Sequence, residues 1–443
     1  MRKVTKYTWD FYPQFKSVFP RDTFEQEAHN MNFTRRIDDS WSFRTANTKE
    51  FTHCYHTYPA MMIPQVARAL IREYHPNDRC KLLFDPYMGS GTSLVEALLA
   101  GINAVGTDLN PLARLMSRVK TTHYDARQIA DQYGEIITAT LTYHPEQVIN
   151  RNFDRISNYS FWYTEDALLR LSFLSQLIDN TGINADFFRI ALSEVVREVS
   201  FTRNGEFKRY RMDESRIQNF HPDVFALFDA KVHRNLMGLQ AFNHSHSIAQ
   251  AHTYGFNTVT EIPADILAPE SVDMVVTSPP YGDSHTTVAY GQFSRWANEW
   301  FNFEHASNLD NFLMGGKKKQ IPVYITESIY EQLAAIQQAD EKRFAEVASF
   351  LNDYWFSMQA VAHVVRKGGM CCYVVGNRNV KGIQIPLDYF TAETFTRLGF
   401  QHIETIVREI PNKRMPALTS PSNKPGENVG TMTNEYIVIL QKQ

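Results

Sequence analysis

The segment VVTSPPYG, residues 275–282, places polar and aromatic side chains directly after an apolar run. Pro279 and Pro280 cannot donate backbone hydrogen bonds or continue a central strand, so the strand ends near Ser278 and the backbone after it is stiff. This corner can fix the Ser278 hydroxyl and the Pro279 carbonyl as two acceptors, with the Tyr281 ring nearby. Acceptors aimed at an exocyclic amine localise its lone pair, which is catalysis by positioning and electrostatics. An ordinary strand-ending turn is the alternative.

A second candidate site is DPYMGSGT, residues 85–92, between an apolar strand and a helix. Gly89 and Gly91 let the backbone approach a ligand, and the helix N-terminus offers amide donors. Asp85 would repel a phosphate and suits an amino group. Asp108 ends the next strand, where a carboxylate can hold ribose hydroxyls. S-adenosylmethionine has a cationic amino-acid end, a ribose and no phosphate, so it is the expected cofactor; a structural turn with surface acids is the alternative.

The elements that position these motifs alternate between strand and helix. Strands are expected at 81–85, 103–108, 271–281, 368–377, 400–410 and 434–440, the last two antiparallel at the sheet edge. Helices are expected at 56–75, 93–100, 342–366 and 387–398, with another opened by Pro111. This order predicts an α/β fold with a mostly parallel sheet. Both motifs then lie at carboxyl ends of parallel strands, where open sheets bind ligands.

Helical patterns interrupt the α/β order in the middle of the chain. Residues 168–178 and 187–201 each place apolar side chains on one face, which indicates an inserted helical subdomain. The expected organisation is an N-terminal arm at 1–52, a cofactor-binding part at 53–120, the helical insert at 121–250 and a catalytic part at 251–443, with an insertion loop at 297–345.

Composition narrows the class of protein. The 443 residues are 43% hydrophobic and 21% charged, as in soluble globular proteins. No apolar run is long enough to span a membrane, and the start of the chain lacks a signal-peptide core. The four cysteines form no CxxC pair, so neither a metal site nor a disulfide framework is expected. A cytoplasmic location is expected instead. A net charge of −3 argues against wholesale electrostatic binding to nucleic acid but allows a local basic face.

DPYMGSGT, with DLNP downstream and TSPPY later, resembles the DNA amino-methyltransferases, which use S-adenosylmethionine to make N4-methylcytosine or N6-methyladenine. The resemblance covers roughly 53–120 and 265–440 and implies a Rossmann-like class I methyltransferase fold with a mostly parallel seven-stranded sheet. HTYPAMMIP is similar to the family segment over the methionine end of the cofactor. The family usually has an acid near adenine, for which 255–258 and Asp265 are the candidates. By position, the resemblance implies these cofactor-binding residues: Tyr58, Pro59, Asp85, Pro86, Gly89, Ser90, Gly91, Thr92, Asp108, Leu109 and Asn110.

The same resemblance implies that Ser278, Pro279, Pro280 and Tyr281 are catalytic, with Tyr281 stacking on a base flipped out of a duplex. No cysteine follows a proline, which excludes a carbon-5 cytosine enzyme. Serine at the head of the motif favours cytosine N4 over adenine N6, for which aspartate is usual. The expected partners are double-stranded DNA and a cognate restriction endonuclease. The alternatives are an adenine-N6 enzyme, an RNA or tRNA base N-methyltransferase, and an inactive nucleic-acid-binding protein on the same fold.

Three basic stretches are candidates for phosphate contacts, with a solvated charged face as the alternative. They lie at 197–211, where Phe207 and Tyr210 are interleaved, at 315–319 and at 408–416. The predicted nucleic-acid-binding residues are Arg203, Lys208, Arg209, Arg211, Lys317, Lys318 and Arg414. The residues that could shape the base pocket are His285, Tyr290, Phe293 and Trp296, with core packing favoured for the aromatic ones. Either the insert or 297–345 could carry target recognition.

Overall fold

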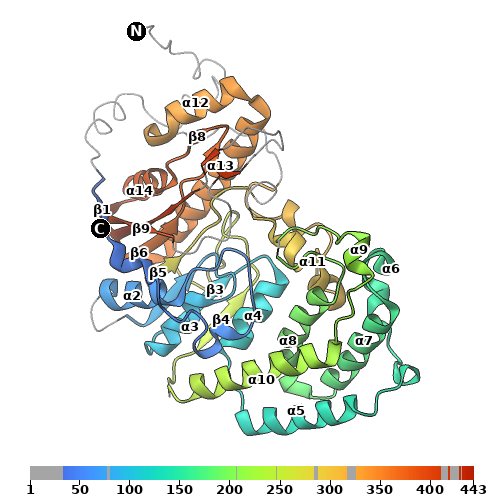
Figure 1. Ribbon diagram of the computed structural model, residues 1–443. Coiled ribbons are helices and arrows are strands. Elements are labelled where there is room, and N and C mark those ends of the chain that lie inside the picture. Colours follow the sequence, from blue (N-terminus) through green and yellow to red (C-terminus); the bar gives the residue numbers. More distant parts are fainter. Residues whose placement is uncertain are drawn as a thin grey trace.

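A computed structural model describes residues 33–76, 80–205, 207–245, 247–283, 288–316, 326–410, 418–419, 429–430 and 432–443. Its centre is an eight-stranded sheet in the order β1-β9-β12-β6-β5-β2-β3-β4 (Figure 1). The strands are β1 Arg35–Ile37, β2 Leu82–Asp85, β3 Asn103–Thr107, β4 Ala251–Tyr254, β5 Val272–Thr277, β6 Val365–Val375, β9 Phe400–Glu409 and β12 Asn434–Lys442. Two short antiparallel pairs lie outside it: β7 Asn379–Val380 with β8 Ile383–Gln384, and β10 Leu418–Thr419 with β11 Val429–Gly430.

The five strands from β4 to β6 run parallel, which confirms the expected α/β fold. The predicted antiparallel pair is also present, because β12 is antiparallel to β9. Its place differs from the expectation: β12 also pairs with β6 and so lies inside the sheet. The six strands expected by residue range are joined by two others, β4 beside β3 and β1 beside β9, so the sheet has eight strands where the resemblance implied seven. Strand β1 has only three residues, all exposed, so it leaves no apolar pattern in the sequence.

Helices cover both faces of the sheet, because successive strand residues point to opposite sides. On one face α2 Pro64–Tyr74 and α3 Thr92–Leu99 pack on side chains that include Leu83 and Met274. On the other face the core includes Phe84 and Val275, under α12 Tyr330–Ala339, α13 Glu341–Val364 and α14 Leu387–Arg397. The predicted insertion loop at 297–345 thus contains α12. Among the described residues, no helix combines the length and apolarity needed to cross a membrane.

The helical insert forms a layer beside the sheet, turquoise to yellow-green in Figure 1. Its helices are α5 Ala126–Thr140, α6 Tyr159–Trp162, α7 Glu165–Asp179, α8 Ala185–Glu198, α9 Glu214–Ile217 and α10 Val224–Asn243. All of these except α9 share one hydrophobic core with α4 Pro111–Thr121 and α11 Tyr290–Trp300, in which Trp296 and Trp300 are completely buried. Since α4 follows Asp108 at the end of β3 and α11 follows the proline corner, this core ties the insert to both regions.

Candidate active site

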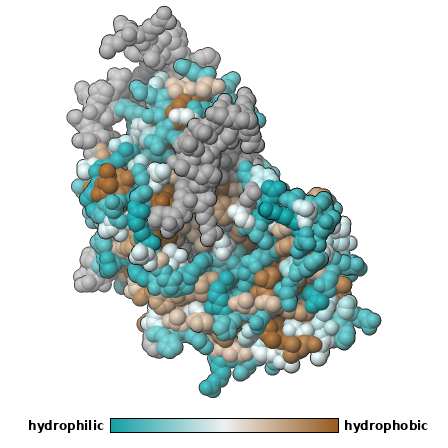
Figure 2. Space-filling model, in the orientation of Figure 1, coloured by the Kyte–Doolittle hydropathy of each residue, from teal (hydrophilic) through white to brown (hydrophobic). Residues whose placement is uncertain are grey.

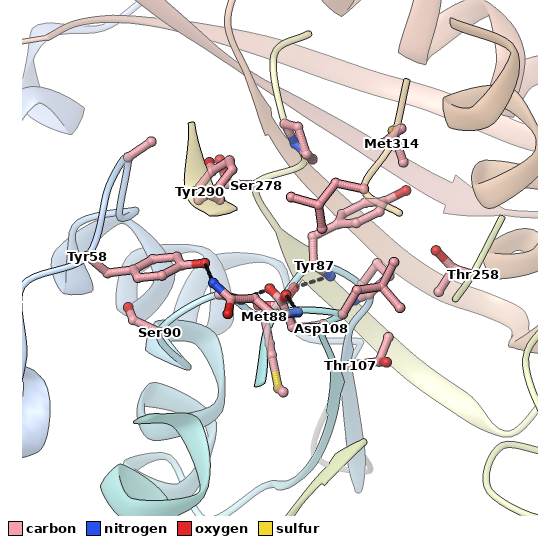
Figure 3. A pocket seen from close by; sticks show the side chains of 18 of the residues that line it. Tyr58, Tyr87, Met88, Ser90, Thr107, Asp108, Thr258, Ser278, Tyr290 and Met314 are labelled. Atoms are coloured by element: carbon pink, nitrogen blue, oxygen red, sulfur yellow. Dashed lines mark hydrogen bonds between the residues drawn. The ribbon is translucent and has the colours of Figure 1, made fainter. Parts of the chain in front are cut away.

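A cleft lies at the carboxyl ends of the central parallel strands (Figure 3). It is lined by residues of the segments 58–62, 85–93, 107–110 and 256–259, by Ser278 and Pro280, and by Tyr290, Leu313 and Met314. Every predicted cofactor-binding residue except Gly91 is in this lining. The glycine loop and the proline corner, far apart in sequence, therefore face the same space.

The glycine loop connects β2 to α3 and depends on two positive φ angles. Gly91, the N-cap of α3, has φ 78°, and Gly89 has φ 46°. A Cβ on Gly91 would lie 2.9 Å from Ser117 Cα on α4, so this position has no room for a side chain. The Ser117 hydroxyl donates to the Gly89 carbonyl at 2.9 Å. Gly91 thus acts from behind the cleft, by letting the loop pack against α4.

Asp108 holds the glycine loop to the end of β3. Its carboxylate accepts hydrogen bonds from the Gly89 amide at 3.0 Å and from the Asn110 amide at 2.8 Å. Burial raises the pKa of Asp108 to about 6, against the lowering effect of these bonds. Each carboxylate oxygen can accept a further bond, so the group can still bind a hydroxyl in the cleft.

Asp85 links the two sequence motifs directly. It is buried at the end of β2, and its Oδ1 accepts from the Thr277 hydroxyl at 2.6 Å and from the Tyr87 amide at 3.1 Å. Thr277 is the last residue of β5 and immediately precedes Ser278. Burial raises the pKa of Asp85 to about 6. The carboxylate therefore fixes the glycine-loop strand and the proline corner relative to each other.

The charge of the cleft restricts what it can bind. Of the described residues in its lining, Asp85 and Asp108 are the only charged ones, and none is Lys, Arg or His. A phosphate would meet two carboxylates without a compensating cation, which is strongly unfavourable in a buried site. A ligand with ammonium and sulfonium charges would be attracted. The apolar part of the lining, which could pack on an adenine ring, includes Met61, Met62, Met88, Leu109 and Phe256. The residues present thus fit S-adenosylmethionine.

Asn110 orders the side of the cleft that Tyr58 lines. Its buried amide nitrogen donates to the Tyr58 hydroxyl at 2.9 Å and to Ser294 Oγ at 2.7 Å, while its oxygen caps α4. Tyr58 stacks on Tyr290 with ring centroids 5.6 Å apart. Tyr58, Ser278 and Tyr290 can be followed around the hollow in Figure 3. Asn110 therefore reaches the site mainly through Tyr58 and the anchoring of α11.

The loop after β4 supplies another side of the cleft without a charge. Phe256, Asn257 and Thr258 line it, as anticipated for the region near adenine, but Asp265 does not. The Thr258 hydroxyl lies 2.5 Å from Ser357 Oγ on α13. The family's usual acid is thus absent from the described part of this wall. Across the described residues, no group of three or more His, Cys, Asp or Glu side chains is placed to hold a metal ion.

The proline corner presents Ser278 and Pro280 to the cleft, whereas Pro279 is buried and Tyr281 is half-buried outside the lining. The Tyr281 hydroxyl lies 3.2 Å from Ser278 Oγ and donates to Glu435 Oε1 at 3.0 Å. Sequence reasoning missed Glu435. The only local signal is an acid at the start of an apolar strand, and nothing in that pattern connects it to Tyr281.

A buried ion pair supports the corner from behind. Asp283 accepts from Arg378 Nη1 at 3.3 Å, with exposed side-chain fractions of 2% and 13%. A Cβ on Gly282 would overlap the Arg378 guanidinium, so glycine is needed for this approach. Both partners lie just beyond strands of the central sheet, β5 and β6. The pair holds the residues after Tyr281 against the loop that follows β6.

The predicted phosphate-binding residues fall into two groups. Arg209 lies over the Trp296 ring at 4.7 Å, and burial lowers its pKa to about 10. Arg211 lies over the Phe161 ring at 4.3 Å and donates to the Phe161 carbonyl. Both therefore pack on aromatic rings of the helical layer, while Arg203 is exposed and Lys208 is half-buried. Lys317, Lys318, Arg414 and His285 lie outside the described residues.

The aromatic residues predicted near the base pocket also fall into two groups, one in the cleft and one in the core of the helical layer. Tyr290 lines the cleft. Phe293 and Trp296 are buried in the core of the helical layer, which was the favoured alternative for them. The Trp296 ring nitrogen donates to the Thr202 hydroxyl at 3.0 Å, so α11 anchors the start of the basic segment. Arg408, from the third basic stretch, is buried and pairs with Glu435.

Comparison with known proteins gives one relative that matches over nearly its whole length. The type II methyltransferase M.MvaI of Kocuria varians is 39% identical over 439 residues, 92% of this chain and 95% of that protein. M.MjaII of Methanocaldococcus jannaschii, also a type II methyltransferase, is 34% identical over 98 residues, 21% of this chain and 18% of its own. No protein-family model matches. The solved rRNA methyltransferase AviRa of Streptomyces viridochromogenes aligns at 11% identity, with 92% and 93% of the chains covered, but its TM-score of 0.33 is too low to bear on the fold.

Proposed function

This chain belongs to the type II DNA methyltransferases, and we propose that it methylates the exocyclic amine of a base flipped out of double-stranded DNA, with cytosine N4 as the target. S-adenosylmethionine is the methyl donor. The resemblance seen in the two sequence motifs is thereby confirmed at the level of the family. The choice of base, the roles of individual residues and a cognate restriction endonuclease belong to the proposal.

One observation carries the proposal: Ser278 faces a cleft whose only charged lining residues, within the described chain, are two carboxylates. The carboxylates suit a cationic cofactor, which supplies an electrophilic methyl group when bound. In this proposal Ser278 Oγ accepts a hydrogen bond from the target amine. This bond would localise the nitrogen lone pair and orient it, which is electrostatic preorganisation without a covalent intermediate.

The neutral head of the motif supports cytosine. Ser278 brings no charge to the amine, and the 256–259 wall of the cleft has no acid. The motif thus resembles that of the cytosine-N4 enzymes, which begins with serine, and differs from that of the adenine-N6 enzymes, which usually begins with aspartate. Adenine remains the competing target within the same family.

The DNA-binding surface is proposed on the segment between Thr202 and Arg211. These two residues form an isolated β-bridge that closes the segment into a loop beside α11. Phe207 and Tyr210 are 46% and 47% exposed there, next to the exposed Arg203. The neighbouring surface over α9 is largely hydrophilic in Figure 2. Exposed aromatic rings between cations can contact bases and phosphates. We place target recognition in the helical insert on this ground.

The test is incubation of the protein with plasmid DNA and methyl-labelled cofactor, followed by nucleoside analysis. Labelled N4-methylcytosine is expected. Labelled N6-methyladenine would overturn the choice of base and keep the family. Ser278→Ala should abolish transfer and leave cofactor affinity within about twofold, because the side chain acts on the amine. A fully active Ser278→Ala variant would refute the role given to this hydroxyl.

A further inference from the structure

Three oxygen atoms form a chain that runs from the cleft into the sheet. Ser278 Oγ lies 3.2 Å from the Tyr281 hydroxyl, which lies 3.0 Å from Glu435 Oε1 on β12. Ser278 lines the cleft, and Tyr281 and Glu435 are outside its lining. The carboxylate is therefore one hydroxyl removed from the residue that faces the substrate.

We propose that Glu435 is a positioning residue that sets the direction of this hydrogen-bond chain and so makes Ser278 an acceptor toward the target amine. The inference rests on the proposed function, because it assigns the group that prepares Ser278 for that substrate. Glu435 touches neither substrate nor cofactor and acts only through the Tyr281 hydroxyl.

The direction follows from the number of protons available. An ionised carboxylate accepts hydrogen bonds and donates none, so the single Tyr281 hydroxyl proton points to Glu435. The Ser278–Tyr281 bond must then be donated by Ser278. The Ser278 oxygen keeps only lone pairs for the cleft. If Tyr281 instead donated to Ser278, the serine proton would be free to point at the amine. The Ser278 O–H and the amine N–H would then both be donors, and no hydrogen bond could form between them.

Two further contacts keep the chain in place. Arg408 Nε lies 3.1 Å from the second carboxylate oxygen of Glu435, and Arg408 Nη1 donates to the Trp41 carbonyl at 2.9 Å. The Tyr281 ring lies on the backbone of Gly376, where a Cβ would come within 2.6 Å of ring atom Cδ2. Burial, reinforced by the Glu435 charge, raises the pKa of Tyr281 well above its usual value, so the hydroxyl stays a donor.

The experiment is a double-mutant cycle on the single-turnover rate of methyl transfer to plasmid DNA, with full-length protein and saturating cofactor. Glu435→Gln is nearly isosteric, but its amide can turn a donor to Tyr281 and release the direction of the chain. We expect at least a tenfold lower rate with cofactor affinity within about twofold. Tyr281→Phe keeps the ring and removes the relay, and it should lose at least tenfold as well. The double variant should be no more than about twofold slower than Tyr281→Phe, because contacting groups that act as one unit are non-additive.

Glu404→Gln is the matched control. It makes the same change at another glutamate that accepts from a tyrosine hydroxyl, Tyr74 to Glu404 at 2.6 Å, on the neighbouring strand β9 and outside the cleft lining. Its transfer rate should equal that of the unmodified protein. A general effect of losing a glutamate from this sheet would slow it too and would overturn the inference.

The outcomes separate this inference from the function itself. Unmodified protein that makes no methylated base refutes the proposed function. Active unmodified protein with a fully active Glu435→Gln or Tyr281→Phe variant refutes the inference alone. Losses that multiply in the double variant also refute it, because Glu435 would then act independently of Tyr281. If Glu435→Gln does not fold, the Tyr281→Phe variant alone tests the inference. The Tyr281 hydroxyl, which this variant removes, is the only link proposed between Glu435 and Ser278.

Discussion

Cofactor affinity should fall steeply as the pH drops from 7 to 5. Burial raises the pKa of both Asp85 and Asp108 to about 6 in the free protein. A cationic ligand binds the ionised carboxylates, so each must lose its proton before or during binding. The α-amino group of the cofactor, with a reference pKa near about 8, keeps its charge throughout this range.

The size of the effect follows from the two pKa values. With a pKa of about 6, a carboxylate is about 90% ionised at pH 7 and about 10% ionised at pH 5. The dissociation constant should therefore rise about tenfold for each carboxylate and about 100-fold for the pair, or about 1.4 kcal/mol for each factor of ten. These two groups do not unfold the protein in this range. Their pKa is higher in the folded chain than in the unfolded chain, so their protonation favours folding as the pH falls from about 6 toward 4.

Isothermal titration of cofactor at half-unit pH steps measures this dependence, and circular dichroism checks the fold at each pH. Asp85→Asn and Asp108→Asn each remove one titrating group and keep an acceptor oxygen. Each variant should bind more weakly at pH 7 and lose only about tenfold between pH 7 and 5. An affinity that stays constant to pH 5 in a folded protein would refute the idea that these carboxylates face the positive charges of the cofactor.

Four other outcomes are expected. Gly91→Ala should weaken cofactor binding at least tenfold in titration, because the loop must move off α4. Gly101→Ala is the control, since Gly101 has a similar φ of 75° but nothing within 4 Å of the new Cβ. It should lower the free energy of unfolding by about 1 kcal/mol without changing the affinity for the cofactor. Lys208→Ala should weaken DNA binding and reduce its salt slope by about one, measured by fluorescence anisotropy. Arg209→Met should lower Tm while preserving the salt slope, since its guanidinium packs on Trp296; an unchanged Tm would contradict this. Ser278→Ala protein should retain cofactor binding while nucleoside analysis finds no methylated base.

Much of the geometry around the glycine loop could be predicted because it is local. Gly89 and Gly91 allow the positive φ angles of the loop, and the strand–turn–helix order around them places Asp85 and Asp108 at adjacent strand ends. The prolines end β5 at Thr277 wherever the strand lies in the sheet. These features depend on backbone geometry within a few residues, which residue type alone controls.

Other features were decided only by the packing of distant elements. Tyr281 and Glu435 are 154 positions apart and meet because β12 inserts between β6 and β9. Arg209 looked like a phosphate-binding residue in a basic stretch, but α11 brings Trp296 to it. β1 joins the sheet beside β9, and Arg35 on this strand also bonds Asp388 on α14. Amino-acid type and spacing determined the glycine loop and the proline corner, whereas strand order and register decided which side chains support them, because such contacts join segments that no local pattern relates.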